Sequence, residues 1–173
     1  MKKVSAVILS LLIAMTPVNL FATELSDEQI GNISTNCASI QLRLKQIQKN
    51  DARSRVYLGA QFETISSNLM MNLNLRLVKN NIANANISSQ QTDFAAERDA
   101  FKSDYITYSQ ALENLISINC KDEPQHFYDQ LETVRSHRST VAKHVKRLAE
   151  MVDEHRKAIL DMRESFAPKE EHE

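Results

Sequence analysis

The order of apolar and polar positions divides the chain into three stretches that repeat at alternating spacings of three and four residues. The longest stretch covers residues 127–166, which is more than five heptads. A repeat of about 3.5 residues keeps one face of a helix against its neighbours over many turns. The stripe consists of Phe127, Leu131, Val134, Arg138, Val141, Val145, Leu148, Val152, His155, Ile159, Met162 and Phe166. We therefore predict a long helix over residues 124–166 that belongs to a coiled coil or bundle.

The first repeating stretch begins after Ser26. Ser26 and Gln29 have the spacing of a capping box, in which each side chain satisfies a backbone N–H at the start of a helix. The apolar stripe that follows is interrupted at Asp51 and Ser54 and then resumes. We predict one helix over residues 27–70.

Residues 71–88 depart from this pattern. Leu73, Leu75 and Leu77 alternate with polar residues, and asparagines dominate positions 80–86. Asparagine favours turns, so we predict a bent last turn followed by a connector. A β-strand over the three leucines is the alternative, although it would lack a pairing partner.

The second stretch predicts a helix over residues 89–119, with Ser88 or Ser89 as its cap. Asp122 and Pro124 form a tight junction into the last helix. Since short connections make neighbouring helices antiparallel, the fold predicted for residues 23–168 is an all-α, antiparallel three-helix coiled-coil bundle. The charged tail at 169–173 follows it.

Residues 1–22 resemble a secretory signal peptide. Lys2 and Lys3 precede a short apolar run at 4–15, and Ala22 ends a plausible cleavage site. The run is shorter than the ~20 residues that span a bilayer, although an uncleaved anchor is the alternative. The sequence therefore predicts export to the periplasm, the cell surface or the extracellular space.

The two cysteines, Cys37 and Cys120, both follow the predicted signal peptide. An even number of cysteines in an exported protein favours a disulfide, because the compartment is oxidising. We predict an intramolecular bond between them. An intermolecular bond and free thiols are the alternatives.

The predicted helices can also be placed in register. A bond between Cys37 and Cys120 pairs the first two helices, and a tight turn after Cys120 makes the third helix parallel to the first. Asp51 then faces Arg138, with Tyr105 of the second helix at the same level. We predict that Asp51, Tyr105 and Arg138 form a half-buried or buried polar layer that fixes the register. Two exposed charges that share a level by coincidence are the alternative.

Composition and charge exclude some classes of protein. The chain has 2 Gly, 3 Pro and no Trp, which argues against a β fold with frequent turns. Its formal net charge is -1, and it becomes -3 when Lys2 and Lys3 are removed. Nucleic-acid binding usually needs a basic face, so we expect no nucleic-acid partner.

The sequence contains no nucleophile elbow, phosphate-binding glycine loop or Cys-x-x-Cys pair, so we expect neither catalysis nor a cofactor. His137 and His144 are a heptad apart, about 10 Å along a helix, which is too far for one ion without further ligands. No metal site is predicted. Basic residues at 135–147 are interpreted as a solvated face, since acidic residues surround them.

Several segments carry a resemblance to a known family. They are Cys37 to Ile40, residues 44–59, 73–81 and 107–109, the run from Leu112 to Cys120, and Phe127-Tyr128. In these segments the chain resembles a family of exported helical proteins from candidate-phylum bacteria of the Saccharibacteria type. The family has Pro where this chain has Asn72, which leaves the helix break near Met71 open. The resemblance implies a bacterial envelope or secreted setting and no activity.

Taken together, these features predict an exported structural or protein-interaction bundle of the cell envelope or surface. Its partner is a protein whose identity the sequence does not reveal, and the membrane is contacted only through the export signal. The chain is expected to be a monomer or a weak dimer. A holdase-like extracytoplasmic chaperone or binding module is the alternative function.

Overall fold

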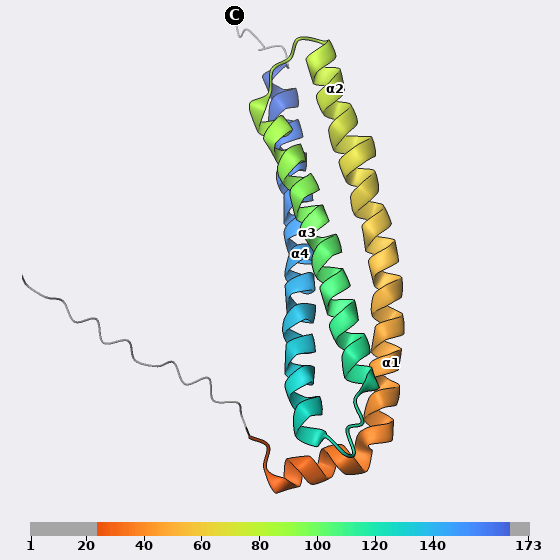
Figure 1. The fold of residues 1–173 in the computed structure, drawn as a ribbon. Helices are drawn as coiled ribbons and strands as arrows, with labels where there is room; N and C mark the ends of the chain where they lie inside the picture. The colour runs from red at the N-terminus through yellow and green to blue at the C-terminus, as the bar shows by residue number, and fades with distance from the viewer. Residues whose placement is uncertain (1–23, 167–173) are drawn as a thin grey trace, which may run out of the picture.

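A computed structural model describes residues 24–166, which form a three-helix bundle (Figure 1). The helical elements in chain order are α1 (Asp27–Thr64), the π-helix η1 (Ile65–Met70), α2 (Met71–Lys79), α3 (Ala85–Ser117) and α4 (Pro124–Ser165). The predicted all-α bundle with one disulfide between helices is confirmed. The predicted signal peptide at 1–22 and the tail at 169–173 lie outside the described residues.

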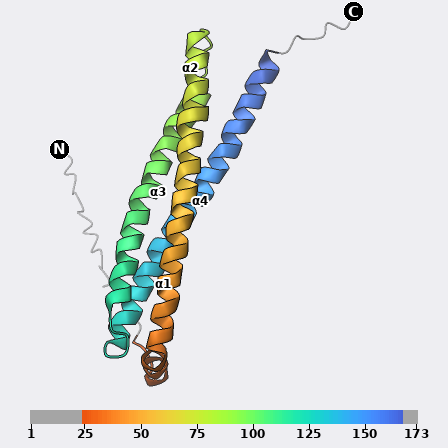
Figure 2. The ribbon, with the colours of Figure 1, turned by 90° about the vertical axis from the view of Figure 1, so that its right-hand side faces the viewer.

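The capping box predicted at the start of α1 is present. The Oγ atom of Ser26 accepts the N–H of Gln29, and Oε1 of Gln29 accepts the N–H of Ser26. The first turns of α1 lie across the lower end of the bundle before the helix joins its long axis (Figures 1 and 2). The side chain of Asn36 donates to the carbonyl of Asn32 in this region.

The predicted end of the first helix at residue 70 is wrong. The chain stays helical through η1 and α2 to Lys79. A π-helix holds one more residue per turn, so the face toward the core shifts by one position. Leu69 is consequently 60% exposed, whereas Met70 is 1% exposed. After this shift Leu73 and Leu77 are one helical turn apart and both join the core.

The connection from α2 to α3 is therefore shorter than predicted. The turn covers residues 80–84, where Asn81 adopts a positive φ of 58°. Asn84, rather than Ser88 or Ser89, caps α3, because its Oδ1 accepts the N–H of Ile87 at 3.1 Å.

The core consists of three clusters along the bundle. The cluster at the near end, where the disulfide lies, includes Leu44, Leu112, Leu115, Phe127 and Val134. In the middle cluster the ring of Phe62 makes edge-to-face contacts with Phe94 and Phe101. The cluster at the far end, beside the turn at 80–84, is built around Leu77, Ile87 and Ala158.

The three helices do not pack equally. α3 makes most of its contacts with α4, while α1 touches α4 at few points along its length. In two views at right angles the far end of α4 stands apart from α2 (Figures 1 and 2). Hollows lined by residues of both helices lie between α1 and α4, so this side of the described bundle is incompletely closed.

Candidate functional site: the groove between α1 and α4

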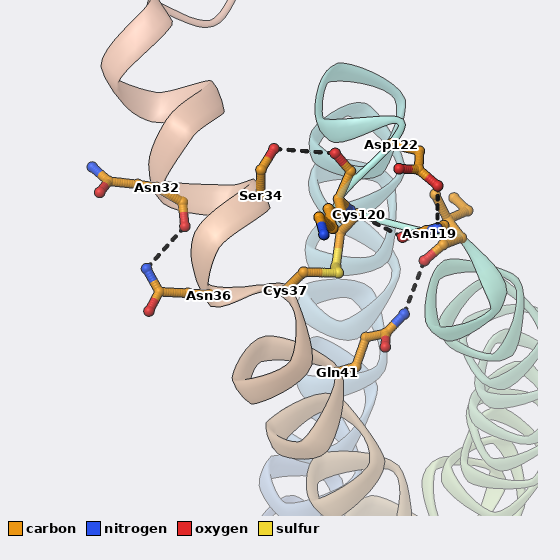
Figure 3. The surroundings of a disulfide bond; sticks show 10 residues. Asn32, Ser34, Asn36, Cys37, Gln41, Asn119, Cys120 and Asp122 are labelled. Carbon is orange, nitrogen blue, oxygen red and sulfur yellow. Dashed lines mark hydrogen bonds between the residues drawn. A yellow bond between two sulfur atoms is a disulfide. The ribbon is translucent and has the colours of Figure 1, made fainter.

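The disulfide fixes α1 to the connection between α3 and α4 (Figure 3). The Cα atoms of Cys37 and Cys120 are 5.5 Å apart, within the usual range for a disulfide. Ser34 donates to the carbonyl of Lys121 at 3.3 Å, and Gln41 donates to the carbonyl of Ile118 at 3.0 Å. These contacts hold the near end of the groove at a fixed width.

The polar layer brings α1, α3 and α4 together. Arg138 donates Nε to Oδ2 of Asp51 at 2.8 Å and Nη2 to Oδ1 at 3.1 Å. The hydroxyl of the buried Tyr108 donates to Oδ2 of Asp51 at 2.6 Å. The carboxylate side chain is 20% exposed and the guanidinium side chain is 56% exposed. Asp51 and Arg138 are therefore paired. Asp51 is half-buried in this layer, whereas Arg138 is exposed to solvent.

The third member of the layer is Tyr108 rather than the predicted Tyr105. Tyr105 lies one turn away, with its ring edge-to-face to Tyr108 and Arg55 placed 5.6 Å from its ring centroid. The prediction counted back from Cys120 at the helical rise, but α3 ends at Ser117. Extended residues advance about 3.3 Å each against about 1.5 Å in a helix. One extended residue adds about 2 Å, so it takes all three non-helical residues at 118–120, beginning with the extended Ile118, to move α3 along by as much as about one turn.

The electrostatics of the layer favour the ionised carboxylate. Burial raises the pKa of Asp51, but hydrogen bonds from Arg138 and Tyr108 and the charge of Arg138 outweigh it, so the pKa lies below its ordinary value. Burial and the hydrogen bond to Asp51 raise the pKa of Tyr108. Tyr108 therefore stays a hydrogen-bond donor, and the layer acts as a bridge across the groove.

The groove holds three hollows in series. The near hollow, of about 540 Å³, and the middle hollow, of about 590 Å³, meet at Tyr108 and Arg138. The far hollow, of about 540 Å³, lies between η1–α2 and the end of α4. The apolar side chains in the near and middle hollows that are only half-buried are Ile33, Ile40, Ile47, Leu58, Leu131, Val141 and Val145.

Arginines line the edges of the groove. On the α1–α2 side they are Arg43, Arg55 and Arg76, none of which forms an ion pair with a described residue. On the α4 side Arg135 pairs with Glu132 and Arg156 with Asp153, while Arg138 pairs with Asp51. Asp51 is the one carboxylate in the described lining of the three hollows.

The basic residues on α4 differ from those on α1. Lys146 pairs with Glu150, and Arg147 pairs with Glu154 at 2.8 Å. This pattern fits the predicted solvated face. On α1 the cations at 43, 45, 49, 53 and 55 form no ion pair within residues 24–166. The sequence prediction missed this set, although the scarcity of carboxylates between Gln29 and Phe62 could have indicated it.

Two histidines on α4 have contrasting surroundings. Nδ1 of His144 lies 2.7 Å from Oε1 of Glu97, and Nε2 lies 2.7 Å from Oδ2 of Asp104. Burial alone would lower the pKa of His144, but these hydrogen bonds outweigh it and raise the pKa. Burial lowers the pKa of His155, whose Nδ1 lies 3.1 Å from Oε1 of Gln90.

These groups do not make a metal centre. The carboxylates of Glu97 and Asp104 lie on opposite sides of the His144 ring and have no common point to offer an ion. Across residues 24–166 no group of three or more His, Cys, Asp or Glu is placed to hold a metal. In the same range no helix is both long enough and apolar enough to cross a bilayer.

The chain was compared with family models, with curated proteins and with solved structures. None of the three comparisons gave a match, so the resemblance noted in the sequence stays a prediction.

Proposed function

We propose that the protein is an exported interaction bundle whose α1–α4 groove receives a helix of a partner protein. The observation that carries the proposal is the half-burial of apolar residues that should meet in a closed seam, such as Ile47, Leu58, Leu131 and Val141. Apolar side chains at such positions lose water contact when a complementary stripe covers them. An amphipathic helix laid into a groove supplies such a stripe.

The chemistry of the groove edge indicates what the partner helix carries beside its apolar stripe. Arg43, Arg55 and Arg76 border the hollows without a described carboxylate partner. Acidic residues that flank the apolar stripe would complement these arginines and would orient the helix. The Asp51–Arg138 bridge divides the groove, so each hollow admits a segment of roughly two to three turns rather than one uninterrupted helix.

Two further features support an exported interaction protein rather than an enzyme. A disulfide is typical of an oxidising compartment, and the one formed by Cys37 and Cys120 closes the near end of the bundle. Among the described residues that line the groove there is a single carboxylate, Asp51, and it is occupied by Arg138 and Tyr108. This arrangement offers no acid–base pair to a substrate.

The proposal is tested by site-specific photo-crosslinking in the native cell. A crosslinking residue at Leu131 or Val141, inside the groove, is expected to capture a defined partner, and mass spectrometry should map the adduct to an acidic amphipathic helix. The matched control carries the crosslinker at Ile106, which is exposed on α3. A groove-filling Leu58→Arg substitution should abolish capture, whereas Ile106→Arg on the exposed side of α3 should not. Equal capture from Ile106 and the groove would refute the proposal.

A holdase-like chaperone is the second candidate, and one observation favours it. Met71, Leu75 and Val78 share one exposed face of α2, which is separate from the face that lines the far hollow. Unfolded chains bind exposed apolar surface without a fixed sequence. A holdase should suppress the aggregation of a reduced model protein at stoichiometric amounts, and replacing these three residues with Ser should remove that effect. A chain that leaves aggregation unchanged is not a holdase.

A further inference from the structure

The outer face of α1, turned away from α3 and α4, combines apolar and cationic side chains. It is defined here by six residues at helical spacing, namely Leu42, Lys45, Lys49, Arg53, Val56 and Tyr57. Leu42 is 71% exposed, and Val56 and Tyr57 are each 64% exposed. Single exposed apolar side chains are common on protein surfaces, so it is the grouping of these three with cations on one helix face that carries the argument.

The cations on this face have no internal partner. Lys45, Lys49 and Arg53 form no ion pair with any residue that the structure describes. Between Gln29 and Phe62 the chain has one acidic residue, Asp51, whose carboxylate binds Arg138 in the groove. The outer face is therefore locally positive on a chain whose formal net charge is -1.

We propose that the outer face of α1 lies on the surface of an anionic lipid bilayer. Anionic headgroups attract Lys and Arg, and their long side chains let the cationic ends stay at the headgroups while neighbouring apolar side chains enter below them. The face extends for about 22 Å along one helix. This proposal concerns a different face from the α1–α4 groove and does not depend on the function proposed for it.

The shape of the face favours a bilayer over an acidic protein. Lys49, Ala52, Arg53, Val56 and Tyr57 surround an open, shallow hollow on a single helix. Specific protein interfaces centre on a pocket that buries an anchoring side chain, whereas the hollow on this face is open to solvent and is lined by one helix only. A flat, mobile surface of negative charge needs no pocket. Binding of this kind is reversible and weakens as salt screens the charges.

A single fluorescent reporter tests the proposal directly. The chain has no Trp, so Tyr57→Trp places one tryptophan on the outer face and Ile106→Trp places one on exposed α3 as the matched control. The protein is used from residue 23 onward, so that the apolar run at 4–15 cannot bind lipid itself. Vesicles containing phosphatidylglycerol should shift the Tyr57→Trp emission to the blue and allow quenching by brominated acyl chains. Vesicles of phosphatidylcholine alone should leave the emission unchanged.

A second test removes the positive charges of the outer face. Replacing Lys45, Lys49 and Arg53 together with Gln should weaken vesicle binding on the order of 100-fold, at roughly fivefold for each cation. The matched control replaces Lys146, Arg147 and Arg156, which are paired on α4, with Gln and should bind as the parent chain does. Circular dichroism verifies that both triple variants remain helical.

Three results would overturn the proposal. They are equal blue shifts from Tyr57→Trp and Ile106→Trp, equal losses in the two triple variants, and binding to soluble polyglutamate as tight as binding to anionic vesicles. The last result would assign the face to an acidic polymer or protein rather than to a bilayer.

Discussion

The two ends of the bundle are held by different means. At the near end the Cys37–Cys120 disulfide ties α1 to the α3–α4 connection, and the backbone N–H of Leu25 donates to Oε1 of Gln125 at 3.0 Å. At the far end the chain is held by a small apolar cluster around Leu77, Ile87 and Ala158, without a covalent tie in the described residues. Stability should therefore decrease along the bundle from the near end to the far end.

The different ways in which the two ends are held affect how the groove can receive a partner. The disulfide ties the near end of α1 covalently to the α3–α4 connection, whereas at the far end of the described residues α2 is held against α4 by non-covalent packing. Regions with few buried contacts open at a lower free energy than the rest of a fold. A partner helix would thus meet a groove whose width is fixed at the disulfide and adjustable toward the turn at 80–84.

The largest expected effect follows from removing the disulfide. Cys37→Ser combined with Cys120→Ser should lower the free energy of unfolding by about 4.5 kcal/mol, because the bond closes a long loop in the unfolded chain. The two cysteines are separated by 83 residues. Thermal melts followed by circular dichroism, with and without a reducing agent, measure the loss. An oxidised and a reduced chain that melt at the same temperature would contradict the assigned role of the bond.

Shortening one buried side chain at each end of the bundle compares the stability of the two ends. Leu115 and Ile87 are both fully buried, the first near the disulfide and the second at the far end. Leu115→Ala should cost about 3 kcal/mol of global stability. Ile87→Ala should cost only about 1–2 kcal/mol globally, because the far end already opens on its own. Urea denaturation gives the global values, and amide exchange should show that Ile87→Ala accelerates exchange first around residues 73–90. Uniform acceleration over the whole bundle would contradict the comparison.

Substitutions in the polar layer between the two ends should lower the free energy of unfolding by a smaller amount. Asp51→Ala should cost about 2 kcal/mol, since it leaves the buried Tyr108 hydroxyl and the Arg138 guanidinium without their acceptor. Replacing both Asp51 and Arg138 with Leu should cost less than Asp51→Ala alone, because no unpaired charge then remains. Urea denaturation compares the two, and a more damaging double change would disprove the layer.

Two tyrosines provide the control for this layer. Tyr108→Phe removes the hydrogen bond to Asp51 and should cost about 1 kcal/mol. Tyr105→Phe, at the position that the sequence predicted, removes a hydroxyl that makes no hydrogen bond within the described residues and should be close to neutral. A larger loss from Tyr105→Phe would restore the sequence-based assignment.

Much of the fold could be predicted because the three-and-four repeat and the cysteine pair constrain it. The repeat located the three helices, and the count of residues between them placed Asp51 beside Arg138. Two local departures from regular helix geometry were not predictable in this way. The π-turn at η1 moved the inward face from Leu69 to Met70, and the non-helical residues at 118–120 placed Tyr108 rather than Tyr105 beside Asp51. The repeat changes after residue 70, but an apolar pattern does not distinguish a π-turn from the end of a helix.

The groove was not predicted for a related reason. A repeat shows which side chains face inward, but it does not show how closely two helices approach. Val141 and Leu148 both occupy the longest stripe, yet Val141 is half-buried at the groove while Leu148 is fully buried under the aromatic cluster. The distance between α1 and α4 depends on the volume of the α3 side chains between them, and a single helix pattern contains no such information.

The smallest expected effect is a dependence on pH that has opposite signs in two parts of the bundle. A neutral imidazole has one N–H, so only protonated His144 can donate to both Glu97 and Asp104. Its pKa is raised in the fold, so its stabilisation is complete below the ordinary value of about 6.5 and is lost as the pH rises through the raised pKa. The pKa of buried His155 is lowered, so its neutral form is favoured, and stability falls when the pH drops below about 6.5.

Lowering the pH from about 7.5 to about 5.5 should therefore stabilise the middle of the bundle through His144 and loosen the far half through His155. Thermal melts over this range should show stability that rises with pH in His144→Gln, where His155 acts alone, and that falls with pH in His155→Gln. His137→Gln serves as the control, because His137 has no hydrogen bond or ion pair among the described residues. Amide exchange at both pH values locates the two effects. If protection at the far end, corrected for the intrinsic slowing of exchange at low pH, increased at the lower pH in the parent chain, the burial of His155 would not destabilise its charged form. The far end would then be held more firmly than its small apolar cluster indicates.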